Sequence, residues 1–154
     1  MSPIKTLLRS ALCAAVAVVS LSAGFAAPAS AAPATEHAAV AAGEVMVVTS
    51  ANIAQVMEIS KTKLVILDFG ATWCGPCRQL KPVLERMATE YGDRILIGSV
   101  DTDQQRSLST QYRIRYLPTM VPIRKGAELA NSRSVGFPGE QGVRQWINTQ
   151  LAKG

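Results

Sequence analysis

The chain has 154 residues, of which 48% are hydrophobic and 18% are charged, and its formal net charge is +5. This length suits one domain and leaves little room for a second, and the composition is that of an ordinary globular protein. The basic residues are scattered, as at Arg106, Arg124 and Arg144, which is typical of a solvated surface, so we expect no nucleic-acid partner.

Residues 1–31 are predicted to be a secretory signal peptide that is cleaved off. Lys5 and Arg9 precede an apolar stretch over residues 11–27, and Ala29-Ser30-Ala31 offers the small residues that precede a cleavage site. The alternative is an uncleaved membrane anchor, but this Ala-rich stretch is short for a hydrocarbon layer of ~30 Å. We therefore expect a periplasmic or secreted protein.

Two other interpretations of the N-terminus fit the pattern less well. A lipoprotein modified at Cys13 would need an apolar stretch before the cysteine, and almost none is present. A mitochondrial transit peptide would normally carry more basic residues. If Cys13 leaves with the signal peptide, two cysteines remain, which excludes a scaffold held together by several disulfides.

Residues 32–43 are rich in Ala and Pro and show no periodicity, which predicts a linker. His37, the only histidine, falls in this segment without neighbouring ligand residues, so we assign it no function. The folded domain is predicted to span residues 44–154.

Hydrophobic periodicity and turn residues divide this domain into strands and helices. Strands are predicted over residues 44–49, 64–69, 94–100, 119–123 and 132–136, and helices over residues 52–60, from the cysteines to Tyr91, 104–112 and 140–153. The strand over residues 64–69 is apolar on both faces and should lie centrally in the sheet. The order βαβαββα predicts an α/β domain whose mixed central sheet has helices on both faces.

Two cysteines separated by two residues, Cys74-Gly75-Pro76-Cys77, stand where the central strand gives way to a helix. A helix N-terminus presents free N–H groups and a positive dipole end, both of which favour a thiolate. The spacing lets one thiol resolve a mixed disulfide formed by the other. We expect Cys74 to be the exposed nucleophile and Cys77 the buried resolving thiol, with Gly75 and Pro76 keeping the turn tight.

Other uses of this cysteine pair are less well supported. A zinc site needs about four ligands, and no second cysteine pair or nearby histidine is present. A c-type haem site needs histidine where Arg78 stands. A purely structural disulfide would close too short a loop to stabilise the fold much.

Asp68 places a carboxyl group within an apolar strand, six residues before Cys74. Burial disfavours the charged form and raises the pKa of such a group. We expect Asp68 to accept or donate the proton of Cys77. The alternative is a strand-end acid that is bound to backbone N–H groups.

For three further residues, the neighbouring sequence allows two interpretations each. Pro118 starts a strand, where either a trans or a cis bond fits, and only ~5% of such bonds are cis. Gly136 permits either a close backbone approach or an ordinary turn. Trp73 is either a core aromatic or an exposed side chain beside the reactive thiol, and its loop position favours exposure.

The segments DFGATWCGPC, IRYLPT and SVGF, together with Pro82, resemble the thioredoxin family in order and spacing, over about residues 44–154. The resemblance implies a thioredoxin fold with a five-stranded sheet in the order 1-3-2-4-5. It implies that Cys74 is the nucleophile, Cys77 the resolving thiol, Asp68 the buried acid and Pro118 a cis-proline. The residues that would border a groove for an extended partner polypeptide are Trp73, Gly75, Pro76, Leu117, Pro118 and Gly136.

Three residues depart from the family pattern. Gly70 stands where relatives commonly have a bulky aromatic residue, and Ser99 where many have a lysine that pairs with the buried acid. Without that lysine, Asp68 should be harder to ionise. Pro122 falls inside a predicted strand, where it should cause a bulge or a lost hydrogen bond.

These observations predict an exported, monomeric thiol–disulfide oxidoreductase that reduces protein disulfides. No bound cofactor is implied, because the electrons pass through the Cys74–Cys77 pair itself. An exported reductase would need a membrane or reductase electron donor. The alternatives are a disulfide oxidase or isomerase, and a non-catalytic binding module that uses the same groove.

Overall fold

The computed structural model describes residues 43–153. The predicted signal peptide, most of the predicted linker and His37 lie outside these residues. In chain order the elements are β1 (Val45–Val47), α1 (Ile53–Ile59), β2 (Leu64–Gly70), α2 (Gly75–Tyr91), the 3-10 turn η1 (Gly92–Arg94), β3 (Ile95–Asp101), α3 (Arg106–Gln111), β4 (Thr119–Arg124), β5 (Ala127–Glu128), β6 (Ser134–Val135) and α4 (Gly139–Ala152).

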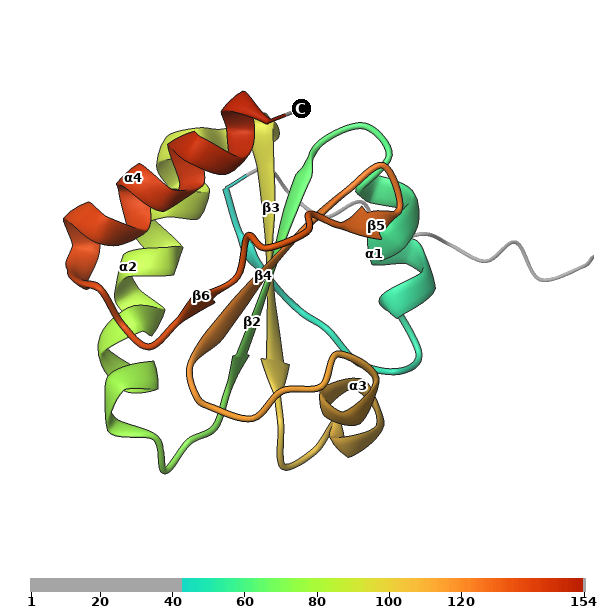
Figure 1. Cartoon of the computed structure of the whole chain (residues 1–154), viewed down its shortest axis with the longest axis vertical. Coiled ribbons are helices and arrows are strands. Elements are labelled where there is room, and N and C mark those ends of the chain that lie inside the picture. Colours follow the sequence, from blue (N-terminus) through green and yellow to red (C-terminus); the bar gives the residue numbers. More distant parts are fainter. Residues whose placement is uncertain (1–42, 154) are drawn as a thin grey trace, which may run out of the picture. The chain divides into compact units, whose positions relative to one another are not determined.

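The strands form one mixed sheet in the order β1-β3-β2-β4-β5, and β6 also pairs with β4. β1 and β2 run parallel to β3, whereas β4 runs antiparallel to β2. Helices α2 and α4 cover one face of the sheet, and α1 and α3 cover the other (Figure 1). The expected α/β class, strand order and two-sided helix cover are therefore confirmed.

The predicted last strand, residues 132–136, is present in shortened form as β6, but the short strand β5 before it was not predicted. Both strands pair with β4, and the register shifts between them: Ile123 pairs with Glu128, but Met120 pairs with Ser134. The extra residues between β5 and β6 bulge out of the ladder. Gly126 turns the chain before β5, as expected, with a φ of 78°.

Pro122 explains where this interruption falls. Its carbonyl oxygen accepts a hydrogen bond of 2.9 Å from the N–H of Leu129. The N–H and C=O of one residue in an antiparallel strand point to the same neighbour. The missing N–H of Pro122 therefore faces the interrupted β5/β6 edge, while its register with Ile66 of β2 is unbroken.

The two faces of β2 supply the two halves of the core. Leu64 and Ile66 pack with buried residues of α2 and α4, whereas Val65, Leu67 and Phe69 pack in the core on the other face. Each such side chain stabilises the fold by about 1.5–3 kcal/mol when fully buried. Since side chains alternate along a strand, the residue after Leu67 points toward α2.

Helix α2 begins and ends as its sequence predicts. Cys74 is its N-cap, and Gly92, with a φ of 51°, ends it. The helix continues through Pro82, and its inward face is formed by residues such as Leu80, Leu84 and Met87. Among the helices within residues 43–153, none has the length and apolar character needed to cross a membrane.

Candidate active site

The cysteine pair lies at the end of β2, where a short turn leads into α2. The N–H of Cys74 donates to the carbonyl oxygen of Ala71 at 3.1 Å and closes this turn. The N–H of Thr102 donates to the carbonyl oxygen of Gly70 at 2.9 Å. This bond ties the end of β2 to the chain after β3, so the turn is held by the sheet.

Cys74 and Cys77 form a disulfide, with their Cα atoms 5.2 Å apart. The Sγ atom of Cys74 accepts a hydrogen bond of 3.2 Å from the N–H of Cys77, and Pro76 lies in the same first turn. That turn contains no acidic residue, so no carboxylate within the turn offsets the positive end of the helix dipole. In the reduced protein the same N–H group and dipole would stabilise a Cys74 thiolate.

The expected difference in exposure between the two cysteines is wrong for this disulfide form. Cys74 is 5% exposed and Cys77 is 8% exposed. The cause is packing, because both side chains form a small apolar cluster with Ala71, and Leu117 packs against it. Cys74 keeps its place at the helix N-cap, but its side chain is covered in the oxidised protein.

Asp68 lies on the α2 face of β2 and is 7% exposed. Its Oδ1 atom is buried and has no hydrogen-bond partner. Burial raises the pKa of Asp68 from 3.8 to about 7. A carboxyl group with this pKa can take up and release a proton near neutral pH. The expected rise in pKa is confirmed, and the alternative of binding to backbone N–H groups finds no support at Oδ1.

Pro118 and Gly136, which the family resemblance assigns to the substrate groove, are joined by a backbone hydrogen bond. The Leu117–Pro118 bond is cis. The family resemblance implies this bond, whereas the neighbouring sequence alone favours a trans bond. The N–H of Gly136 donates to the carbonyl oxygen of Pro118 at 2.8 Å. Gly136 has a φ of 81°, a region that favours glycine. A Cβ atom at Gly136 would meet no other part of the described chain within 4 Å, so the turn conformation explains this glycine and a close backbone approach does not.

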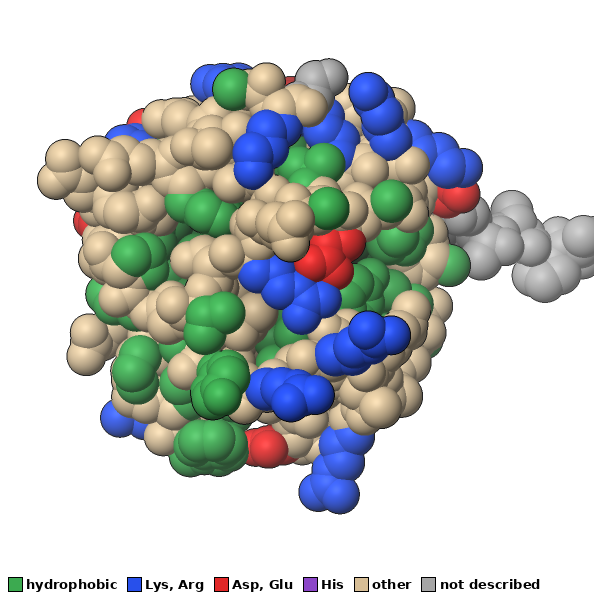
Figure 2. Space-filling model, in the orientation of Figure 1, with side chains coloured by type: hydrophobic (Ala, Val, Ile, Leu, Met, Phe, Trp, Pro, Cys, Tyr) green, Lys and Arg blue, Asp and Glu red, His purple; other side chains and the backbone are tan. Residues whose placement is uncertain are grey.

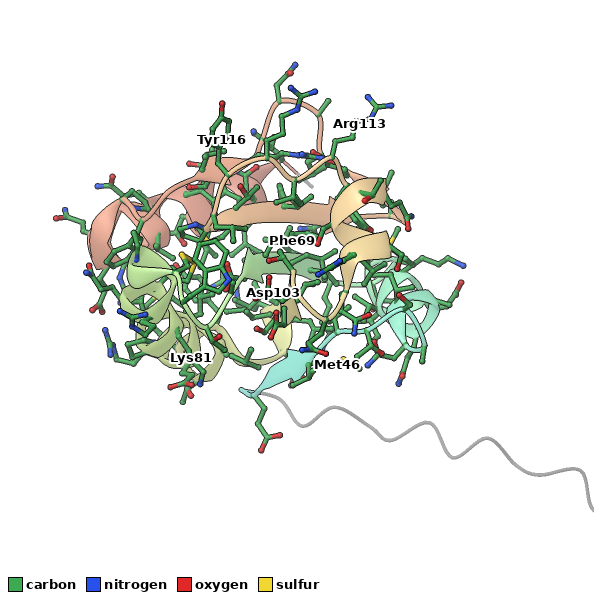
Figure 3. All side chains as sticks on the ribbon, turned by 90° about the horizontal axis from the view of Figure 1, so that it is seen from below. Met46, Phe69, Lys81, Asp103, Arg113 and Tyr116 are labelled. Atoms are coloured by element: carbon green, nitrogen blue, oxygen red, sulfur yellow. A yellow bond between two sulfur atoms is a disulfide. The ribbon has the colours of Figure 1, made fainter. Side chains whose placement is uncertain are left out.

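Trp73 is 67% exposed, which confirms the predicted exposed position. Its Nε1–H donates to Oδ2 of Asp103 at 2.9 Å, so the indole is held over the loop after β3. Tyr116 and Val135 are also strongly exposed, at 69% and 58%. Hydrophobic side chains gather at the lower end of the surface in Figure 2, and Figure 3 shows Tyr116 and Asp103 from this end.

Sequence reasoning missed Asp103, Tyr116 and Val135 as members of this surface. Tyr116 has a sequence signal, because it immediately precedes Leu117 and Pro118. Asp103 has none, since it joins Trp73 only through the fold. Within residues 43–153, no group of three or more His, Cys, Asp or Glu residues is arranged to hold a metal ion.

Comparison with known proteins points to one family. The family model described as Thioredoxin matches residues 44–149. The thioredoxin of Bacillus subtilis is 33% identical over 88 residues, which cover 57% of this chain and 83% of that protein. The thioredoxin of Mycolicibacterium smegmatis is 34% identical over 95 residues, covering 60% and 83%.

Solved structures agree with the sequence relatives. The X-ray structure of Fasciola hepatica thioredoxin superimposes with a TM-score of 0.63 at 32% identity and covers 69% of this chain and 99% of that one. The thioredoxin of Malassezia sympodialis gives the same TM-score at 31% identity, covering 75% and 98%.

Proposed function

The chain belongs to the thioredoxin family of disulfide oxidoreductases, and from this premise we propose that it is a protein-disulfide reductase that acts outside the cytoplasm. One observation carries the proposal. The Cys74–Cys77 disulfide lies at a helix N-terminus, and Asp68, a buried carboxyl group with a pKa of about 7, lies on the adjoining strand.

The reaction we propose has two exchange steps. The Cys74 thiolate attacks one sulfur of a substrate disulfide, forms a mixed disulfide and expels the other substrate sulfur as a thiolate. The Asp68 carboxylate then takes the proton of Cys77, whose thiolate attacks Sγ of Cys74 and releases the second substrate sulfur. Two electrons pass from the dithiol to the substrate, and the enzyme is left with the Cys74–Cys77 disulfide.

The exposed side chains around the disulfide support a polypeptide substrate. Trp73, Tyr116 and Val135 are large, apolar and exposed, and aromatic anchors of this kind dominate many protein contacts. Leu117, which follows Tyr116 in the chain, packs against the cluster that contains the two cysteines. An extended segment beside Leu117 would bring its cystine to Cys74.

The predicted signal peptide supports an exported location, and Gly75-Pro76 between the cysteines resembles reducing family members. In an oxidising compartment, the disulfide would have to be reduced again by a membrane or reductase electron donor. Expression of the full chain in a bacterial host, followed by fractionation and intact-mass measurement, tests export. A protein of full mass in the cytoplasm would contradict this part of the proposal.

The catalytic part is tested by cysteine variants and a disulfide-reduction assay. Wild type should accelerate reduction of insulin by dithiothreitol, whereas Cys74→Ser should not. Cys77→Ser should accumulate mixed disulfides through Cys74, and the trapped proteins identify substrates. If partner function survives both substitutions, the domain is a binding module instead.

The direction of the reaction is tested by the reduction potential of the pair. A potential near those of strongly oxidising family members would indicate an oxidase. For this two-electron couple, ~30 mV corresponds to ~1.4 kcal/mol, so small changes around the disulfide decide the direction.

A further inference from the structure

Two cavities meet at the buried carboxyl group of Asp68. One has a volume of about 290 Å³ and reaches Cys77 and Gly70. The other has a volume of about 420 Å³ and reaches Val45 on β1. Three residues, Asp68, Lys81 and Ser99, line both of them.

Small side chains at two positions leave this space open. Ser99 is paired in register with Asp68 across β2 and β3 and contributes only a hydroxymethyl group. Gly70 contributes no side chain, and a Cβ atom there would lie 3.5 Å from both Cβ and Sγ of Cys77. The space beside Asp68 is thus bordered by β2, by β3 and by α2. Lys81 lies on α2, one turn after Cys77.

The charged groups that border this space come from every element packed around it. Helix α2 contributes Arg78, Lys81 and Glu85, the end of β3 contributes Asp101, and Glu44 precedes β1. Cys77 of α2 also lines this space, but it is held in the disulfide. Of the two cations, Arg78 lines only the cavity next to Cys77, and its Nη1 donates to the carbonyl oxygen of Thr72 at 3.2 Å.

Lys81 is free to change its partner. Its side chain is 76% exposed, and its Nζ contacts Oε1 of Glu85 at 2.5 Å in an exposed i,i+4 pair. Such surface pairs are weak, and the lysine side chain is long and flexible. Figure 3 shows Lys81 on α2, on the opposite side of the disulfide from Tyr116. Lys81 thus lies away from the apolar surface proposed for substrates.

We propose that Lys81 is a positioning residue that stabilises ionised Asp68, by exchanging its contact with Glu85 for one with the Asp68 carboxylate through the space beside Ser99. The proposal rests on the disulfide chemistry proposed above, in which Asp68 must be ionised before it takes the proton of Cys77. A carboxylate that is buried without a partner is strongly disfavoured, and a nearby cation favours its ionised form. When Asp68 has taken the proton, the attraction ends and Lys81 returns to Glu85.

The test compares three variants of the oxidised protein by NMR titration of the Asp68 carboxyl carbon. Lys81→Met removes the charge and should raise the pKa of Asp68 by about 0.5 to 1 unit. Lys81→Arg keeps the charge and should leave the pKa within error of wild type. Lys61→Met is the matched control, because Lys61, just after α1, forms a similar exposed pair with Glu58 at 2.7 Å.

A second measurement follows the pH profile of disulfide reduction. Lys81→Met should shift its rising limb to higher pH by the same amount, which a purely structural role would not do. An unchanged Asp68 titration in Lys81→Met, or an equal shift in Lys61→Met, would overturn the proposal. If wild type proves inactive as a reductase, the proposed function fails, but the titration still decides the role of Lys81.

Discussion

Asp68 and Ser99 lie directly opposite each other on the two central parallel strands, β2 and β3. The carboxyl group is buried and its Oδ1 atom has no hydrogen-bond partner. A short, uncharged side chain at position 99 therefore leaves the acid without a cation on its own sheet. Desolvation alone accounts for its pKa of about 7.

This pKa predicts that stability falls as pH rises. The ordinary pKa of the group is 3.8 and the folded value is about 7, so between these values the folded protein holds a proton that the unfolded chain has lost. The contribution is complete below pH ~4 and is lost as pH rises through ~7, on the order of 4 kcal/mol in all.

Urea unfolding of the oxidised protein at pH 4.5, 6 and 8 measures this loss. Asp68→Asn should remove it and should be the more stable protein at pH 8. Asp93→Asn is the control, because Asp93 is exposed and its ion pair with Lys63, at 3.5 Å, lies at the surface. This variant should keep the wild-type dependence of the free energy of unfolding on pH. If the free energy of unfolding fell equally with pH in wild type and Asp68→Asn, another titratable group would be responsible for the loss of stability.

Substitution of Ser99 by lysine should lower the pKa of Asp68. A cation on β3 would enter the space that both cavities share and should shift the Asp68 titration down by about 1 to 2 units. Ser99→Met has similar length without charge and should not lower it. In the Ser99→Lys background, Lys81→Met should no longer change the pKa of Asp68, since the carboxylate would then have a cation within its own sheet. A pKa that stays near 7 in Ser99→Lys would contradict this.

Most of the fold could be predicted from local patterns. The run over residues 64–69 is apolar on both faces, and the helix after it is bounded by Cys74 and Gly92, so strand, turn and helix follow from periodicity and capping. The split into β5 and β6 could not be placed in advance, because the direction in which Pro122 points depends on the register of β4 with β2. The missing N–H of a proline predicts that one ladder is interrupted, but not whether it is the ladder with β2 or the ladder with β5 and β6.

The site residues that could be predicted from the sequence are those whose side chains are unusual for their sequence neighbourhood. Cysteines at a helix start and a carboxyl group inside an apolar strand signal function by themselves. The cis bond at Pro118 follows only from the family resemblance. The hydrogen bond of Asp103 with Trp73 joins residues that are 30 apart in the sequence. Lys81 lines the same cavities as Asp68 only because the fold places α2 beside the sheet. No local pattern therefore reveals either residue.

Two glycines within the sheet should respond oppositely to alanine. A Cβ at Gly70 would make ordinary contact with Cys77 at 3.5 Å, whereas a Cβ at Gly98 would lie 2.6 Å from Cγ2 of Val48 and 3.1 Å from Cδ2 of Leu67. Gly70→Ala should therefore be neutral or stabilising by up to about 1 kcal/mol. Gly98→Ala should destabilise by about 1–3 kcal/mol, because the core is overpacked. Urea midpoints measured on the oxidised proteins test both, and a destabilised Gly70→Ala would show that the space beside Cys77 is smaller than described.

Trp73 and Tyr116 should matter for protein substrates and not for small disulfides. Both side chains are about two-thirds exposed, so replacing either with serine should change the free energy of unfolding by no more than about 0.5 kcal/mol. Loss of one aromatic anchor should raise KM for a protein disulfide by about 5- to 10-fold, with kcat nearly unchanged. The rate with a small aromatic disulfide should stay at the wild-type value, because that substrate reaches Cys74 without contacting the surrounding surface. Equal losses with both substrates would instead indicate that these side chains act on the disulfide itself.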